Sequence, residues 1–228
     1  MQDPQQQPYV VDILDVIDAT VSMRPVIETV KQQAIGFYPK LLTALGSKGK
    51  TISRVRVGVL VFRDVYCDGD RAFEQSPFFE LPAHQAEFER YVNAIEPLGG
   101  GDEPESGLEA VFKAIKSDWS TDAKKQRHII VLRSDASAHP LEKAQGGRPA
   151  NYPADAPTSF SELTDLWFSQ SVSKDAKRMV IFAPDATPWT DIATHWENTI
   201  HYPSRAGEGL SELDAETMLD AIVNSIKS

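Results

Sequence analysis

The chain has 228 residues, a hydrophobic fraction of 41%, a charged fraction of 25% and a formal net charge of −10. These values are typical of one folded domain with a sizeable core, and they exclude disorder of the whole chain. The acidic charge excludes a nucleic-acid or anionic-membrane surface, because both need clustered Lys and Arg. We therefore expect no nucleic acid and no membrane among the partners of this chain. An acidic surface suits cations or basic partners.

The single cysteine, Cys67, excludes an intrachain disulfide and a cysteine-built zinc site. The polar N-terminus shows no signal peptide, and no apolar run approaches the roughly 20 residues that a membrane span requires. We expect a cytoplasmic protein, in which residues 1–8 form a disordered or extended tail and residues 9–228 form a single domain.

Apolar strand patterns and amphipathic helix patterns alternate along the chain. In chain order, they predict a strand at 9–18, a helix capped by Ser22 and stopped at Gly46, a strand at 55–62 and a short edge strand at 78–81. Helices at 83–96 and 105–119, a strand at 129–132, a surface loop at 140–158 and a helix at 159–169 follow. The last predicted elements are a strand at 179–182, a helix at 188–196, a strand near 199–202 and a C-terminal helix opening at 211–214.

This alternation predicts a three-layer, doubly wound α/β fold. Its sheet is expected to be mostly parallel and six-stranded, with one short antiparallel edge strand and helices on both faces. In such a sheet, ligands bind beyond the carboxyl ends of the strands. The residues that immediately follow each apolar run are therefore the candidates for a functional site.

Carboxylates and hydroxyls gather at those strand ends. Asp18, Thr20 and Ser22 follow the first strand at alternate positions, so their three oxygens can converge on one point. Hard oxygen ligands of this kind suit Mg²⁺, Mn²⁺ or Ca²⁺. The same residues could instead do no more than cap a helix. The other candidates at this rim are Asp64, Asp102, Glu105, Ser134, Asp135 and His139. The simplest interpretation of His139 is that it is a surface residue.

Val11 to Met23, with its strand running into Asp18-Ala-Thr-Val-Ser22, resembles the opening of a von Willebrand factor A (vWA) domain. The metal-ion-dependent adhesion site (MIDAS) of that family begins D-x-[ST]-x-S. The segments Phe62-Arg-Asp64, Gly99-Gly-Gly-Asp-Glu-Pro-Glu105 and Ser134-Asp-Ala are similar to vWA domains linked with protein kinases in bacteria and protists, of the alpha-kinase and tellurium-resistance types.

The resemblance implies a metal site formed by Asp18, Thr20, Ser22, Asp102 and Asp135, with Glu105 as the alternative to Asp102 in the second loop. Two positions depart from the family's pattern: Val21 stands where Gly is usual, and the second loop offers an acid where adhesion-type members have Thr.

The function that we expect is a metal-dependent protein-interaction module and not an enzyme. The chain supplies an incomplete oxygen shell, and an Asp or Glu carboxylate of a protein partner completes it. The resemblance implies regulation or recruitment in a kinase- or phosphatase-linked pathway. One alternative is a phosphatase of the haloacid-dehalogenase type, although its nucleophilic position is Val16 here and Asp15 is one residue out of place. Another is a scaffold with a vestigial metal site.

Two charged residues lie inside runs that are expected to be buried. Asp15 and Arg133 belong to strands that are neighbours in a vWA sheet, and an unpaired charge there is costly. We expect them to pair beneath the metal rim, with Arg63 as the second possible partner of Asp15. Charged groups more than about 6 Å apart, beyond ion-pair reach, would reject this.

Overall fold

The computed structural model of the protein describes residues 7–46, 51–101, 103–169, 176–204 and 220. Its centre is a seven-stranded sheet in the order β3-β2-β1-β5-β6-β7, with β4 also paired to β2. Five strands are parallel, and the two short strands β3 and β4 are antiparallel to β2. The strands are β1 (Tyr9–Asp18), β2 (Ile52–Phe62), β3 (Phe73–Gln75), β4 (Phe79–Leu81), β5 (Gln126–Arg133), β6 (Lys177–Pro184) and β7 (Thr199–Ser204).

The mostly parallel α/β fold class predicted from the sequence is confirmed, with one more strand than expected. The additional strand is β3, a three-residue segment of Phe, Glu and Gln that carries no apolar run. Strand β4 takes the place of the predicted edge strand at 78–81. Both short strands lie on the outer edge of β2, where they cover one border of the sheet.

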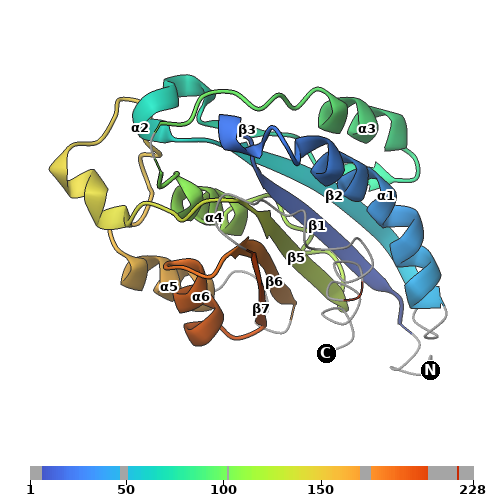
Figure 1. Cartoon of the computed structure of the whole chain (residues 1–228). Helices are drawn as coiled ribbons and strands as arrows, with labels where there is room; N and C mark the ends of the chain where they lie inside the picture. Colours follow the sequence, from blue (N-terminus) through green and yellow to red (C-terminus); the bar gives the residue numbers. More distant parts are fainter. Residues whose placement is uncertain (1–6, 47–50, 102, 170–175, 205–219, 221–228) are drawn as a thin grey trace.

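Strand β1 lies in the centre of the sheet and is buried along all but its first residue. It pairs with β2 on one side, with Asp18 opposite Phe62, and with β5 on the other, with Ile17 opposite Arg133. Later strands of the chain therefore lie on both sides of β1, so the carboxyl end of β1 is the topological switch point of a doubly wound sheet. Its carboxyl end lies beside helix α2 (Val65–Asp68), at the upper left in Figure 1.

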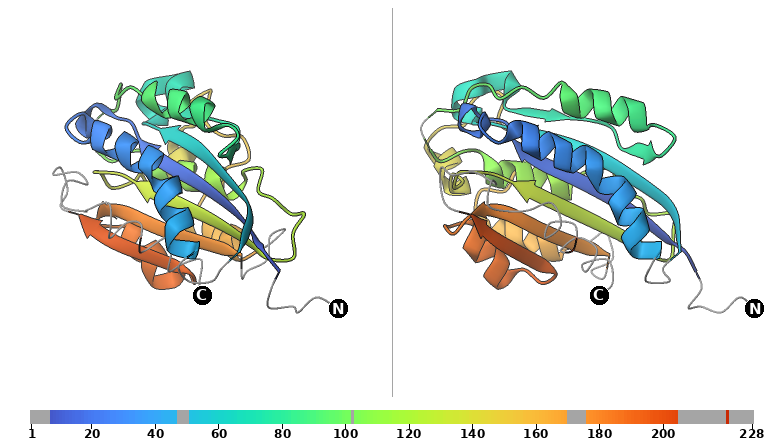
Figure 2. Two further views of the ribbon diagram at one scale, coloured as in Figure 1. Left: turned by 90° about the vertical axis from the view of Figure 1, so that its right-hand side faces the viewer. Right: turned by 45° about the vertical axis from the view of Figure 1, so that its right-hand side comes forward.

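Helices cover both faces of the sheet. Helices α1 (Ile27–Gly46) and α3 (Gln85–Asn93) lie side by side on one face (Figure 2), where Val30 and Phe88 pack against Ile13 and Ile17 of β1. The opposite face carries α4 (Gly107–Ile115), α5 (Phe160–Phe168) and α6 (Trp189–His195); α4 lies against β1 and β2, and α6 lies against β6 and β7. The two cores follow from the period-2 alternation of side chains along a strand. No helix among the described residues is long and apolar enough to cross a bilayer.

The predicted helices that fall on described residues are present, with shorter bounds at several ends. A short 3₁₀ helix, Val21–Met23, precedes α1, so Ser22 lies inside a turn and does not cap the long helix as expected. The predicted helix at 105–119 is α4, whereas α2 and the 3₁₀ helix Gly69–Arg71 are not predicted from the sequence. The C-terminal helix predicted from 211 lies outside the described residues, apart from residue 220.

The segment 140–158 is mostly exposed, as expected of the predicted surface loop, but a few of its residues are buried. It contains a 3₁₀ helix, Leu141–Gly146, and it buries Leu141, Tyr152 and Ala156 against the core. Tyr152 Oη donates a hydrogen bond of 2.8 Å to Oε1 of Glu109, a carboxyl group of α4 that is fully buried. Burial raises the pKa of Glu109 above its usual value. The segment thus closes over a buried acidic group.

Replacing Tyr152 with Phe is expected to lower the free energy of unfolding by about 1–3 kcal/mol, because Oε1 of Glu109 loses its donor while Oε2 already has none among the described residues. Urea denaturation followed by circular dichroism measures the change. The double variant Tyr152→Phe/Glu109→Gln tests the cause. A double variant as unstable as the sum of the two single variants would show that the hydrogen bond is not responsible.

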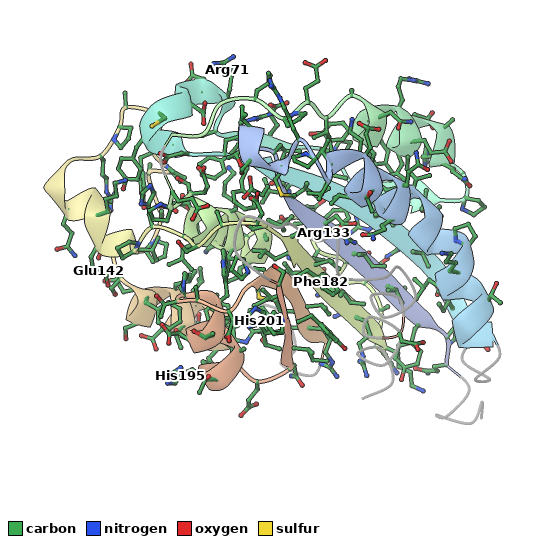
Figure 3. The ribbon with its side chains drawn as sticks, in the orientation of Figure 1. Arg71, Arg133, Glu142, Phe182, His195 and His201 are labelled. Atoms are coloured by element: carbon green, nitrogen blue, oxygen red, sulfur yellow. The ribbon has the colours of Figure 1, made fainter. Side chains whose placement is uncertain are left out.

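The ion pair expected beneath the site is present. Arg133 Nε lies 2.8 Å from Asp15 Oδ1, and both side chains are buried between the sheet and α1. Arg133 also donates to Oε1 of Gln33 at 3.2 Å, and its guanidinium lies over the Phe182 ring, which Figure 3 shows beside it. The second possible partner, Arg63, is engaged elsewhere, with Glu74.

Candidate functional site

Three segments meet at the carboxyl ends of β1, β2 and β5. The segment 97–106 bonds to the loop after β1, where Leu98 N donates to Ala19 O at 2.9 Å and Val21 N donates to Gly99 O at 3.3 Å. It also bonds to the loop after β5, where Glu105 N donates to Ser137 O at 3.1 Å. A third bond joins Ser106 N to the carbonyl of Arg63. These bonds bring side chains from three distant parts of the chain to one rim.

The residues of the first motif form a connected chain of oxygens. Asp18 Oδ1 accepts hydrogen bonds from Thr20 N (3.0 Å) and Thr20 Oγ1 (2.7 Å), and Thr20 Oγ1 lies 2.9 Å from Ser22 Oγ. Ser22 Oγ in turn donates to Asp135 Oδ1 at 3.0 Å. Asp18 and Thr20 are buried, whereas Ser22 is exposed. The alternate spacing thus brings three oxygens together, with Asp135 of the next loop beside them.

Ser134 fixes the orientation of Asp18 from the side of β5. Its hydroxyl donates to Asp18 Oδ2 at 2.7 Å and accepts from Ala136 N at 3.2 Å. Both carboxylate oxygens of Asp18 therefore accept hydrogen bonds, Oδ1 from Thr20 and Oδ2 from Ser134.

Glu105 projects into the same cluster from the segment 97–106. Its side chain is 4% exposed, and Oε2 has no hydrogen-bond partner among the described residues. Burial, together with the nearby carboxylates of Asp18, Asp64, Asp68 and Asp135, raises its pKa to about 8. A buried carboxyl group with an unpartnered oxygen is costly unless a donor or a cation satisfies it.

Glycine is required at position 100 by both backbone and space. Gly100 has φ +77°, and a Cβ there would lie 3.0 Å from Thr20 Cβ and 3.0 Å from Glu105 Oε1. The backbone of the Gly-rich segment therefore runs directly over the site, where a side chain would fill the space between Thr20 and Glu105.

The other predicted acid of this segment, Asp102, lies outside the described residues. The choice between Asp102 and Glu105 therefore stays open, although Glu105 is placed at the cluster. Among the residues that the structure does describe, no three His, Cys, Asp or Glu side chains are placed to share one metal ion. A cation at this rim would consequently depend on the hydroxyls of Thr20 and Ser22 as well as on carboxylates.

Asp64 and His139 form a pair next to the cluster. His139 is buried, so the simplest interpretation from sequence, a surface histidine, is wrong; its Nε2 lies 3.5 Å from Asp64 Oδ1. Asp64 caps α2 by accepting from Tyr66 N at 3.0 Å, and it also accepts from Ser106 Oγ at 3.1 Å. Burial alone would raise the pKa of Asp64, but the hydrogen bonds from His139, Tyr66 N and Cys67 outweigh it and lower this pKa to about 2.

Three residues that sequence reasoning did not select also shape the rim. Asp68 Oδ2 accepts from Gly100 N at 2.8 Å, and it holds the Gly-rich segment in place. Ser106 ties that segment to Asp64 and to Val65 N. Trp189 Nε1 donates to Ala136 O at 2.9 Å, next to Asp135. The sequence signals for two of them are weak: Asp68 lies six residues after β2, and Ser106 directly precedes α4. The role of Trp189 depends on a contact 53 residues away.

The electrostatics of the rim favour a cation. Burial raises the pKa of Asp18 to about 6, with a smaller contribution from the charge of Asp135, and it also raises the pKa of Asp135. Carboxyl groups that resist ionisation in this way lack a nearby positive charge. A divalent cation would supply that charge, and the donor set of carboxylate and hydroxyl oxygens fits Mg²⁺, Mn²⁺ or Ca²⁺.

No protein-family model matches the chain. Over 158 residues, 68% of its length, the chain is 29% identical to the protein of Dictyostelium discoideum named alpha-protein kinase vwkA, and it spans 23% of that relative. Among solved structures, proximal thread matrix protein 1 from the mussel byssus superposes with a TM-score of 0.56 at 13% identity, over 96% of this chain and 49% of that one. The pilus adhesin SpaC from Lactobacillus rhamnosus GG superposes with a TM-score of 0.57 at 13% identity, over 97% and 31%. The likeness to these structures is one of fold.

Proposed function

We propose that the chain is a vWA-type domain that binds a divalent cation, Mg²⁺ or else Mn²⁺ or Ca²⁺, at Asp18, Thr20, Ser22 and Asp135. A second-loop acid, Glu105 or Asp102, completes the set. The observation that carries the proposal is the chain of oxygens from Asp18 to Asp135, with Glu105 Oε2 left without a partner beside it among the described residues.

The proposed role of this site is to bind a protein partner. A cation held there would offer an open coordination position to an Asp or Glu carboxylate of the partner. Ser22 and Val21 are exposed, so one edge of the rim is accessible. With Asp102 as the second-loop ligand the set would contain three carboxylates, and the cation would attract a further carboxylate less strongly than at a site with two.

The kinase named in the relative supports a link to phosphorylation signalling. We propose that the domain recruits or regulates a kinase or phosphatase. The support is the 29% identity over 158 residues.

We propose binding and not catalysis at this rim. A phosphatase of the haloacid-dehalogenase type needs a nucleophilic carboxylate two residues before Asp18, where Val16 is buried in the core. The nearest acid, Asp15, faces the opposite side of the sheet and is paired with Arg133. Asp18-dependent release of phosphate in the presence of Mg²⁺ would favour the enzyme over this proposal.

Isothermal titration calorimetry with Mg²⁺ tests the site. Wild type is expected to bind Mg²⁺ and Asp18→Ala to give no binding heat, because Asp18 is held at the centre of the oxygen cluster. A matched control is Asp165→Ala, which removes an exposed carboxylate from α5, away from the rim. Equal Mg²⁺ affinity of wild type and Asp18→Ala would reject the site. A partner that stays bound in EDTA would support a metal-independent scaffold instead.

A further inference from the structure

Two large apolar side chains are exposed to solvent at the rim that carries the proposed metal ligands. Among the described residues, the exposed large hydrophobic side chains are Val21 (43%), Leu98 (38%), Phe168 (39%) and Ile200 (39%). Phe168 and Ile200 belong to α5 and β7, which contribute no residue to the rim. Val21 and Leu98 belong to the two segments that form the rim, so half of this exposed apolar set lies at the proposed site.

The backbone holds Val21 and Leu98 next to each other. Leu98 N donates to Ala19 O at 2.9 Å, and Val21 N donates to Gly99 O at 3.3 Å. Val21 lies between two of the proposed metal ligands in the sequence, and Leu98 directly precedes the glycines that cross the site. A partner segment whose carboxylate reaches the cation therefore has these two side chains beside it.

Neither side chain contributes to the hydrophobic core of the described residues. Val21 and Leu98 belong to neither of the two core clusters, which consist of side chains packed on the two faces of the sheet. Apolar side chains that are exposed singly are common on protein surfaces, whereas neighbouring ones surrounded by polar groups are typical of an interaction surface. The pair thus has the character of a contact surface.

The apolar surface continues from Leu98 into a hollow beside β2. This hollow has a volume of about 270 Å³, and its lining includes Val61 and Ile95 together with Leu98. Arg63 and Glu74, which also line it, pair with each other at 2.8 Å. A large apolar side chain placed against Leu98 therefore finds further apolar surface on this side.

Charge divides the work between the cation and the apolar pair. The rim carries the carboxyl groups of Asp18, Glu105 and Asp135, and the chain has a net charge of −10, so a partner's carboxylate is repelled unless a cation is present. Apolar contact does not depend on charge and cannot select an acid. The cation would select the acidic residue of the partner, and the apolar pair would select the residue beside it.

We propose that the metal-binding Asp or Glu of the protein partner is flanked in sequence by a large apolar residue, whose side chain packs against Val21 and Leu98. Neighbouring residues of a chain are about 3.8 Å apart, so one short segment makes both contacts. This inference rests on the proposed function, because the cation holds the acid in place.

Fluorescence anisotropy in Mg²⁺ with the full chain tests the proposal. The probes are two labelled peptides of Gly and Ser, one with Leu-Asp-Leu at its centre and one with Ser-Asp-Ser. Wild type is expected to bind the leucine peptide about tenfold more tightly, because a Leu side chain buries part of its apolar surface in the complex.

Two pairs of substitutions test whether Val21 and Leu98 cause this preference. Val21→Ala/Leu98→Ala is expected to bring the ratio of the two affinities close to one. Phe168→Ala/Ile200→Ala removes the other two exposed large apolar side chains and is the matched control, which is expected to keep the wild-type ratio. Leu98→Ala alone leaves the loop of Asp18 unchanged and is expected to lower the ratio at least about twofold.

Calorimetry with Mg²⁺ on the same proteins separates the two proposals. If wild type gives no Mg²⁺ binding heat, the proposed metal site is wrong and this inference fails with it. If wild type binds Mg²⁺ but binds neither peptide at millimolar concentration, or binds both equally, only this inference is overturned. A preference that persists in both Leu98→Ala and the double variant, or that is lost equally in the control, also overturns it.

Discussion

Replacing Arg133 with Met is expected to lower the free energy of unfolding by about 3–5 kcal/mol, because it leaves the Asp15 carboxylate buried without its positive partner. The two groups are 2.8 Å apart, and each side chain is at most 5% exposed. Urea denaturation of wild type and variant, followed by circular dichroism, gives the difference.

A second substitution separates the loss of the partner from the loss of packing. The double variant Asp15→Leu/Arg133→Met replaces both charges with apolar groups and is expected to recover most of the lost stability. If the free energy of unfolding of Arg133→Met lies within about 1 kcal/mol of the wild-type value, as for an exposed ion pair, Asp15 is solvated or otherwise compensated.

In EDTA, the wild-type protein is expected to lose stability as the pH rises. The pKa of Asp18 rises from 3.8 to about 6 on folding, and that of Glu105 rises from 4.5 to about 8. A carboxyl group with a higher pKa in the folded chain binds its proton more tightly there. Its stabilising contribution is complete below the unfolded value and is lost as the pH rises through the folded value. The decline should therefore extend from about pH 4 to about pH 8, and urea denaturation across this interval measures it.

Asp18→Asn identifies the share of this decline that belongs to Asp18. A shift of two pKa units corresponds to roughly 3 kcal/mol, so in EDTA at pH 8 the neutral variant is expected to be more stable than wild type by up to about that amount. Mg²⁺ should stabilise wild type at this pH and leave Asp18→Asn unchanged. If the stability of the two proteins depends on pH in the same way in EDTA, burial does not raise the pKa of Asp18 as expected.

The parts of the site that follow strands directly could be predicted from the sequence. The apolar run of β1 ends at Asp18, and that of β5 ends just before Ser134, so a parallel sheet brings them to one rim. The pair of Asp15 and Arg133 could be predicted for a related reason: two charges inside buried runs must satisfy each other.

The remaining features depend on contacts between distant parts of the chain. Nothing local marks His139 as buried, because it is enclosed by Asp64 and by the ring of Tyr66 at 5.3 Å. The prolines and glycines of the segment 140–158 correctly predict a surface loop, but nothing local shows that a few of its residues, such as Leu141 and Tyr152, anchor it to the core. Strand β3 has only three residues and exists because the edge of β2 is there to pair with it.

The segment 97–106 has a consequence for attempts to transplant the site. Its hydrogen bonds reach the loops after β1 and β5 and the end of β2, yet it belongs to none of these strands. Moving Asp18, Thr20 and Ser22 into the first loop of another doubly wound sheet would therefore transfer the proposed ligands without the hydrogen-bonded segment that sets their spacing. A host protein would also need two glycines that cross above the loop and an aspartate such as Asp68 to hold them. The five-residue motif is a signature of the site, whereas the portable unit is the whole strand-end assembly.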